Sequence, residues 1–337
     1  MTATLDRLSR ALGDLRISVT DRCNLRCPYC MPREIFSRDF AFMPAAELLS
    51  FQEITRLARA FAELGVSKIR LTGGEPLLRR DLERLVEMLT AVAGIDEVAL
   101  TTNGTLLRAK AAVLREAGLA RVTVSLDALD EDVFRSMSDT RFPFARVLAG
   151  IDAAAEAGLA PVKINMVVRR GVNDHCVLSM AEHFRHRPEI LRFIEYMDVG
   201  SSNNWRLEQV VPAGEILRAI ERRWPLQSLQ ATRPGEVATR YRYLDGAGEI
   251  GFIHSVSQPF CGACTRARLT ADGTLYTCLF AAQGEDLRAL LRGGAEDPEL
   301  TRRIAGIWTA RTDRYSAERA SIRGPLAPKV EMSYIGG

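Results

Sequence analysis

The chain has 337 residues, of which 47% are hydrophobic and 26% charged, and 45 basic against 42 acidic side chains leave a net charge of +3. This composition is typical of a globular protein and excludes extensive disorder, and so small a net charge gives no reason to expect binding to nucleic acid or to a membrane surface. No apolar run approaches the ~18 residues of a membrane span, and residues 1–16 carry charges where a signal peptide has its apolar stretch. We therefore expect a cytoplasmic protein.

Strands and helices alternate along most of the chain. Strands are predicted at 15–20, 67–73, 97–104, 121–127, 161–168 and 189–199, and helices at 46–64, 81–93, 106–118, 145–158, 174–186 and 211–224. Six such units in succession require parallel strands with right-handed crossovers. After about residue 225 the alternation ends, and RYRYLD, GEIGFIHSVS and RARLTADGTLYTCLF predict antiparallel strands, with a hairpin turn at Asp272-Gly273.

Polar side chains within these strands favour a barrel over an open sheet. They occupy alternate positions, which lie on one face of a strand, as in Arg16, Ser18 and Thr20, in Lys68, Arg70 and Thr72, in Thr123, Ser125 and Asp127, and in Lys163 and Asn165. A shared polar inner face indicates a wet lumen, not the packed interior of a complete small barrel. We predict an α/β fold: a partial (β/α)6 TIM-type barrel over residues 1–225, and an antiparallel C-terminal extension over 226–337 that closes its open side. Catalytic groups are expected at the C-terminal strand ends.

Six of the seven cysteines form two tight groups, Cys23, Cys27 and Cys30, and Cys261, Cys264 and Cys278. The odd count and the length of the chain argue against a disulfide scaffold and favour metal or redox chemistry. Cys176 stands alone in a predicted helix, where a buried, inert thiol is expected.

The first group is a C-x3-C-x2-C pattern directly after the first predicted strand. Three thiolates without a fourth nearby can hold a four-iron cluster that keeps one iron open to an outside ligand. Zinc is the alternative, although the nearby sequence offers no fourth zinc ligand. Gly73-Gly74-Glu75-Pro76 ends the second strand. Its glycines permit close approach of a ligand to the backbone, and exposed backbone groups and Glu75 could bind an ammonium group.

The second group has the spacing C-x2-C-x13-C, which is an incomplete zinc ribbon. His254 could complete a Cys3His zinc site, so this alternative stays open. Arg266 and Arg268 lie on one face beside these cysteines. Their planar guanidinium groups suit polyanion oxygens and base edges.

The first motif, with Tyr29 just before its third cysteine and GGEP after it, is similar to the signature of radical S-adenosylmethionine enzymes. The resemblance narrows to the GTP 3′,8-cyclase family of molybdenum-cofactor biosynthesis and extends over essentially the whole chain. It is carried by DRCNLRCPYC, KIRLTGGEP, LTTNG, VSLDAL, KINMVV, EYMDVG, CGACTRARLTADGTLYTCLF and the terminal Gly-Gly.

This resemblance implies two [4Fe–4S] clusters, one on each cysteine group, with S-adenosylmethionine on the open iron of the first and the guanine base on that of the second. It implies that a 5′-deoxyadenosyl radical removes the 3′ hydrogen of GTP, and that the sugar radical attacks carbon eight of guanine to give 3′,8-cyclo-7,8-dihydro-GTP. The implied contacts to S-adenosylmethionine are Tyr29, Gly74, Ser125 and Met197. The implied contacts to GTP are Arg16, Arg70, Thr101, Lys163, Arg266, Ala267 and Arg268. A tail ending in Gly336 and Gly337 is expected to reach into the active site and act in catalysis.

The same resemblance implies an electron donor and transfer of the product to cyclic pyranopterin monophosphate synthase. A homodimer is a further expectation, although the sequence does not determine the oligomeric state. Two other classes fit parts of the sequence. One is a radical enzyme that modifies a peptide with the help of an auxiliary iron–sulfur cluster, and the other is a non-enzymatic zinc-binding or nucleic-acid-binding module. By composition alone the terminal Gly-Gly reads as a frayed end, and Met197 reads as core packing.

Overall fold

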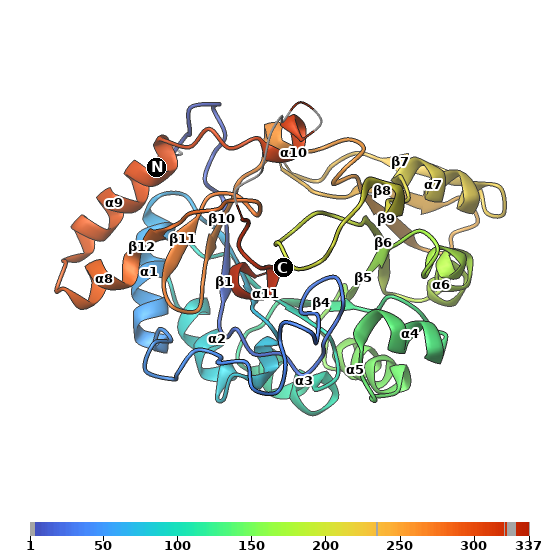
Figure 1. The fold of residues 1–337 in the computed structure, drawn as a ribbon, viewed down its shortest axis with the longest axis horizontal. Helices are drawn as coiled ribbons and strands as arrows, with labels where there is room; N and C mark the ends of the chain where they lie inside the picture. The colour runs from blue at the N-terminus through green and yellow to red at the C-terminus, as the bar shows by residue number, and fades with distance from the viewer. Residues whose placement is uncertain (1–3, 234, 320, 322–327, 337) are drawn as a thin grey trace.

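The structure is a computed structural model that describes residues 4–233, 235–319, 321 and 328–336. Its strands curve into an incomplete ring with most helices on the outside, and the C-terminal segment enters the middle of the ring (Figure 1). This arrangement leaves the inner face of the sheet to line a lumen.

Six neighbouring parallel strands form the centre of the sheet. They are β1 (Asp14–Ser18), β2 (Lys68–Thr72), β3 (Glu97–Thr102), β4 (Arg121–Ser125), β5 (Lys163–Val168) and β6 (Ile190–Glu195). The helices that follow them are α1 (Phe51–Glu63), α2 (Leu82–Thr90), α3 (Leu107–Glu116), α5 (Phe144–Glu156), α6 (Val177–Phe184) and α7 (Ala213–Glu221). All six predicted units are present. The structure adds α4 (Glu131–Ser138), which the sequence did not predict and which Asp130 caps by accepting from the backbone of Asp132 and Val133.

The C-terminal strands continue the same sheet at both edges. They are β7 (Leu226–Leu229), β8 (Thr239–Tyr243), β9 (Glu249–Ile253), β10 (Arg266–Leu269), β11 (Thr274–Tyr276) and β12 (Glu285–Asp286). The predicted antiparallel pairings occur between β8 and β9 and between β10 and β11. However, β9 pairs in parallel with β6, and β10 pairs in parallel with β1. The twelve strands run from β12 to β7 without a pairing between these two edges in the described residues, so the barrel is not closed.

Four further helices complete the described chain: α8 (Leu287–Arg292), α9 (Asp297–Thr309), α10 (Tyr315–Glu318) and α11 (Met332–Ile335). None of the helices in the described ranges is long and apolar enough to cross a membrane.

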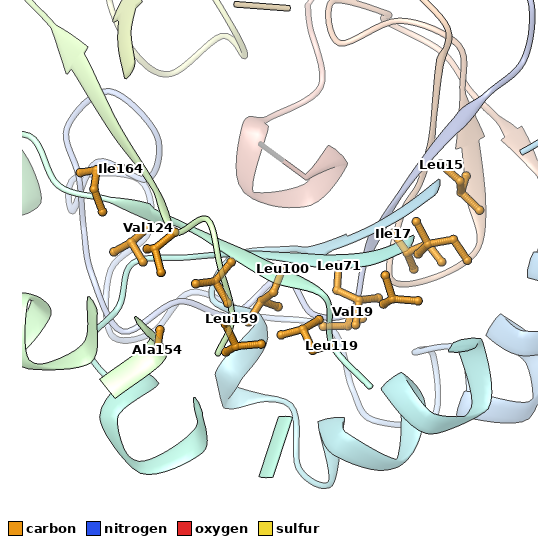
Figure 2. Packing of buried hydrophobic residues seen from close by; sticks show 14 of the residues in the cluster. Leu15, Ile17, Val19, Leu71, Leu100, Leu119, Val124, Ala154, Leu159 and Ile164 are labelled. Atoms are coloured by element: carbon orange, nitrogen blue, oxygen red, sulfur yellow. The ribbon is translucent and has the colours of Figure 1, made fainter. Parts of the chain in front are cut away.

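The hydrophobic core lies between the outer face of the sheet and the helices. Ile17, Leu71, Leu100 and Val124 are at most 1% exposed and point away from the lumen (Figure 2). Because successive side chains of a strand face opposite ways, the residues between them point inward. The predicted division into an apolar outer face and a polar inner face is therefore confirmed.

Candidate active site

A cavity of about 420 Å³ occupies the lumen, and all six grouped cysteines line it. The first group follows the C-terminal end of β1. Cys261 and Cys264 precede β10, which runs parallel to β1, and Cys278 follows the antiparallel β11. The second group therefore lies at the N-terminal end of the barrel. The two groups lie at opposite ends of one cavity.

The loop that carries the first cysteines is tied to the end of β2. Gly74 donates its N–H to the Thr20 carbonyl at 2.8 Å, and Glu75 donates to the Arg22 carbonyl at 2.8 Å. A Cβ atom at Gly74 would lie 2.6 Å from the Arg22 carbonyl carbon and 2.9 Å from the Asp21 oxygen. Only glycine permits this approach of two backbones.

The Glu75 side chain links the ends of β2 and β3 through hydrogen bonds. One carboxylate oxygen accepts from the Leu77 N–H at 3.0 Å and the Thr102 hydroxyl at 2.7 Å, and the other accepts from the Asn103 N–H at 2.8 Å. Glu75 is fully buried and does not line the cavity. The expectation that its side chain would bind an ammonium group is therefore wrong, because the ends of β2 and β3 already use both oxygens.

The first three thiols line the cavity and are partly buried. Cys23 Sγ accepts from the Leu25 N–H at 3.4 Å and from Asn103 Nδ2 at 3.8 Å. Burial raises the pKa of Cys23 to about 11, and burial with neighbouring thiols raises the pKa values of Cys27 and Cys30. Three buried thiolates need a cationic partner, and an iron–sulfur cluster supplies one.

No group of three or more His, Cys, Asp or Glu residues in the described ranges is arranged to hold a metal ion. A four-iron cluster distributes its cysteines over separate iron atoms, whereas the ligands of a single zinc ion converge on one point. His254, the fourth ligand in the alternative zinc reading, does not line the cavity.

The second cysteine group is held by two arginines that the sequence did not single out. Arg10 Nη1 donates to the Cys261 carbonyl and Arg311 Nη1 to the Cys264 carbonyl, each at 2.9 Å. Burial alone would raise the pKa of Cys264, but Arg266 and Arg311 outweigh it and lower the pKa to about 7. The thiolate is therefore favoured at Cys264, whereas burial raises the pKa of Cys278 to about 11. No local pattern marked Arg10 or Arg311, because both reach the cysteines from distant segments.

A row of arginines crosses the lumen between the two cysteine groups. Arg268 on β10 is in register with Arg16 on β1, which is in register with Arg70 on β2. Burial, followed by the charges of Arg70 and Arg266, lowers the pKa of Arg16 to about 9. Burial and Arg192 lower the pKa of Lys163, on the opposite wall, to about 7. Like charges in a confined space favour an anionic ligand.

Two further predicted substrate contacts occupy different positions in the sheet. Thr101 lines the cavity, and its hydroxyl accepts from Arg70 Nη1 at 3.2 Å. Ala267 is 1% exposed and packs in the core. Its side chain lies on the outer face of β10 because its neighbours Arg266 and Arg268 face inward. The side chain of Ala267 therefore does not line the cavity.

The four residues expected at S-adenosylmethionine all line the cavity at the end that holds the first cysteines: Tyr29, Gly74, Ser125 and Met197. The Tyr29 hydroxyl donates to Asp127 at 2.7 Å, and the other oxygen of Asp127 accepts from the Val167 N–H at 2.9 Å. The polar strand pattern included Asp127 but gave it no such role. Asp127 fixes the ring of Tyr29 beside the cysteines.

The C-terminal tail meets the arginine row. Arg268 Nη1 donates to the Gly336 carbonyl, and α11 lies inside the ring of strands (Figure 1). Gly336 has a φ of +82°, and a Cβ atom there would lie 2.6 Å from Thr72 Cγ2. Glycine is therefore required at this position. Gly337, the second predicted catalytic glycine, lies outside the described residues.

Relatives align with essentially the whole chain. The GTP 3′,8-cyclase of Acidothermus cellulolyticus is 54% identical over 98% of both chains, that of Xanthomonas axonopodis pv. citri is 53% identical over 100% of both, and that of Staphylococcus aureus is 47% identical over 98% of both. The chain belongs to the GTP 3′,8-cyclase family. S-adenosylmethionine and [4Fe–4S] clusters are the cofactors that this membership implies.

The family matches place each cysteine group of this cyclase-family chain in a separate segment. Residues 17–184 match the Radical SAM superfamily, and residues 190–317 match Molybdenum Cofactor Synthesis C. The crystal structure of Streptococcus suis SuiB bound to S-adenosylmethionine has a TM-score of 0.61 at 16% identity, covering 90% of this chain and 70% of that one. This likeness supports the fold alone.

Proposed function

We propose that this chain is a GTP 3′,8-cyclase that converts GTP into 3′,8-cyclo-7,8-dihydro-GTP, the first step of molybdenum-cofactor biosynthesis. The observation that carries the proposal is one cavity with a cysteine group at each end and a row of arginines between them. A substrate with a base at one end and a polyanion attached matches this distribution of charge. The relatives named above, at 47–54% identity over the whole chain, support the same reaction.

Cys23, Cys27 and Cys30 hold the first cluster in this proposal. Tyr29, Gly74, Ser125 and Met197 bind S-adenosylmethionine beside it, since all four line that end of the cavity. When bound, the cluster and S-adenosylmethionine supply the organic radical that starts the reaction. The protein holds the reactants in one orientation and excludes water from them.

Cys261, Cys264 and Cys278 hold the second cluster, and the arginine row binds GTP. Arg16, Arg70 and Lys163 neutralise the triphosphate in this proposal. Burial, followed by the charges of neighbouring cationic side chains, lowers the pKa values of all three, and a bound polyanion would offset that repulsion. Arg266 and Arg268 orient the nucleotide beside the second cysteine group. Arg268 also holds the Gly336 carbonyl, so the tail and the substrate share one guanidinium group.

We also propose the partners of this enzyme and the division of its chain into two units. An external electron donor would supply the electron that a cluster on the first cysteine group needs, and the product would pass to cyclic pyranopterin monophosphate synthase. We propose that residues 1–225 form the radical unit and 226–337 the second-cluster unit, and that two copies can form a homodimer. Buried thiols that hold iron–sulfur clusters suit the reducing cytoplasm.

The test is anaerobic incubation of reconstituted protein with S-adenosylmethionine, dithionite and GTP, followed by mass analysis. We expect methionine, 5′-deoxyadenosine and the cyclised nucleotide, and about eight iron and eight sulfide per chain. Cys23→Ala should remove about half of the iron and all cleavage of S-adenosylmethionine. Cys176→Ala is the matched control, because Cys176 is a buried cysteine of the α6 region that does not line the cavity, and it should retain both.

Stoichiometric zinc without sulfide in anaerobically protected protein would overturn the cluster assignment. Cleavage of S-adenosylmethionine without conversion of GTP would overturn the substrate assignment while leaving the radical chemistry in place.

A further inference from the structure

The tail that reaches the arginine row is fastened to the loop that follows β6. Glu331, the residue just before α11, accepts from the Ser201 N–H at 3.0 Å with one carboxylate oxygen and from the Ser202 hydroxyl at 2.7 Å with the other. Two residues earlier, Lys329 exchanges backbone hydrogen bonds with the Ser201 hydroxyl at 2.9 and 3.2 Å. The tail therefore binds the turn at 200–202 through both side chain and backbone.

Gly200 shows that this turn is shaped around the carboxylate. Its φ is +76°, and a Cβ atom built there would lie 3.0 Å from Glu331 Cδ and 3.4 Å from Glu331 Cα. Any side chain at this position would also overlap the carboxylate oxygen. The turn accepts Glu331 only because residue 200 is glycine.

The same loop carries Met197, which lines the cavity at the first cysteine group. Internal hydrogen bonds make this loop one unit: the Asn203 amide donates to the Val199 carbonyl at 2.8 Å and to the Met197 carbonyl at 3.2 Å. Asp198, which follows Met197 in the sequence, accepts from Lys329 Nζ at 2.6 Å. The tail thus binds the loop both before the turn, at Asp198, and within it, at Ser201 and Ser202.

The far side of the tail is anchored separately. The Tyr334 hydroxyl donates to Asp272 at 2.7 Å, in the hairpin between β10 and β11. Ile335 is fully buried, and the N–H groups of Tyr334 and Ile335 both donate to the Glu331 carbonyl. Glu331 therefore starts the single turn of helix that ends at Gly336, whose carbonyl meets Arg268.

We propose that Glu331 is a positioning residue, which couples the loop 196–203 to the tail so that S-adenosylmethionine bound at Met197 stabilises the Gly336 carbonyl at Arg268. The inference rests on the proposed function. A ligand that orders the loop must by reciprocity favour the ordered tail, and an ordered tail must favour the ligand. The tail then reaches the substrate when the radical source is in place.

The test compares Glu331→Ala, Glu331→Gln and Gly200→Ala with Glu53→Ala. Glu53 is the matched control because it also bonds a serine backbone N–H, that of Ser50, in the capping box of α1, away from the cavity. Two quantities are measured: kcat and KM for GTP, and backbone hydrogen exchange of residues 328–336 with and without S-adenosylmethionine. Exchange is measured with oxidised clusters, so that S-adenosylmethionine binds without being cleaved.

In the unmodified protein, S-adenosylmethionine should slow exchange at Tyr334, Ile335 and Gly336. Glu331→Ala should remove this slowing and lower kcat about tenfold or more, while KM for GTP changes less than about threefold. Gly200→Ala should also remove the slowing and lower kcat, although the carboxylate of Glu331 is still present. Glu331→Gln keeps an acceptor oxygen, so its kcat should lie between those of Glu331→Ala and the unmodified protein. Glu53→Ala should lower the melting temperature and keep both kcat and the slowing.

The proposal is overturned if Glu331→Ala keeps its kcat, or if S-adenosylmethionine leaves tail exchange unchanged in the unmodified protein. Should Glu331→Ala fail to fold, Glu331→Gln and the exchange of the unmodified protein decide the question. Failure of the proposed function has a different signature, because the unmodified protein itself would then form no cyclised product.

Discussion

Replacing Gly74 by alanine should disrupt the first cluster without a change of charge or of any thiol. The added Cβ would lie 2.6 and 2.9 Å from backbone atoms of Arg22 and Asp21, where ordinary contacts are 3.4–4 Å. Neither atom belongs to a flexible side chain, so the loop must move by close to 1 Å. Overpacking of this kind costs about 1–3 kcal/mol, and the hydrogen bonds from Gly74 and Glu75 to this loop are each worth about 1 kcal/mol.

The displaced residue Arg22 adjoins Cys23, so the movement reaches a cluster ligand directly. We expect Gly74→Ala to lose about half of the iron after reconstitution and to cleave S-adenosylmethionine at least tenfold more slowly. Gly306→Ala is the control, because no atom lies within 4 Å of its added Cβ in α9. That variant should gain about 0.5–1 kcal/mol of stability from its helix and keep all iron. Full iron content and normal cleavage in Gly74→Ala would refute the close-approach argument.

Two other predictions concern the lumen and the tail. Because the pKa of Lys163 is lowered to about 7 from its ordinary 10.5 by burial and Arg192, its contribution to stability is present above pH 10.5 and is lost as the pH falls through 7. GTP should reprotonate this amine, so calorimetry near pH 8 in buffers of different ionisation enthalpy should show proton uptake that Lys163→Met lacks; uptake of equal size in that variant would contradict it. Removal of Gly336 and Gly337 should leave iron content and GTP affinity nearly unchanged and abolish cyclised product, and normal product formation would show the tail to be dispensable.

The local patterns of the sequence predicted much of the fold. Period-two alternation located β1 to β6 and assigned Arg16, Arg70 and Lys163 to the lumen, because side-chain direction within a strand is a local property. The cysteine spacing predicted two groups, and the structure places both on one cavity. The short helix α4 was missed because its eight residues span barely two turns between stronger elements.

The sequence did not predict which distant segments pair with each other. The parallel attachment of β10 to β1 joins segments that are about 250 residues apart (Arg266 with Asp14), and nothing within either segment encodes its partner. The same holds for Arg10 and Arg311 at the second cysteine group and for Glu331 at Ser202. Glu75 was misassigned for a related reason, since its acceptors are occupied by a hydroxyl and an N–H from the next strand.

Without substrate, the arginine row should make the protein less stable than a variant that lacks one of these charges. Within the described residues Arg16 makes no hydrogen bond or ion pair, and its strand neighbours in register are Arg70 and Arg268. Asp14 raises the pKa of Arg16, but burial and the charges of Arg70 and Arg266 lower it more. Replacing such a cation by an apolar residue of similar length is therefore expected to be stabilising. Because Arg16 is only partly buried, we expect Arg16→Met to gain about 1 kcal/mol, or about 2 °C in Tm, in the absence of GTP.

With GTP present, the unmodified protein should instead be more stable than Arg16→Met. A ligand at 100 times its Kd stabilises the unmodified protein by about 2.7 kcal/mol, and loss of one charge-assisted contact of about 1.5–3 kcal/mol removes most of this gain from Arg16→Met. Thermal unfolding with and without GTP measures both effects. Arg56→Met is the control, since Arg56 pairs with Asp297 on the outer surface, and it should lose a little stability equally in both conditions. If Arg16→Met were less stable than the unmodified protein without GTP, mutual repulsion in the lumen would not be what prepares this cavity for a triphosphate.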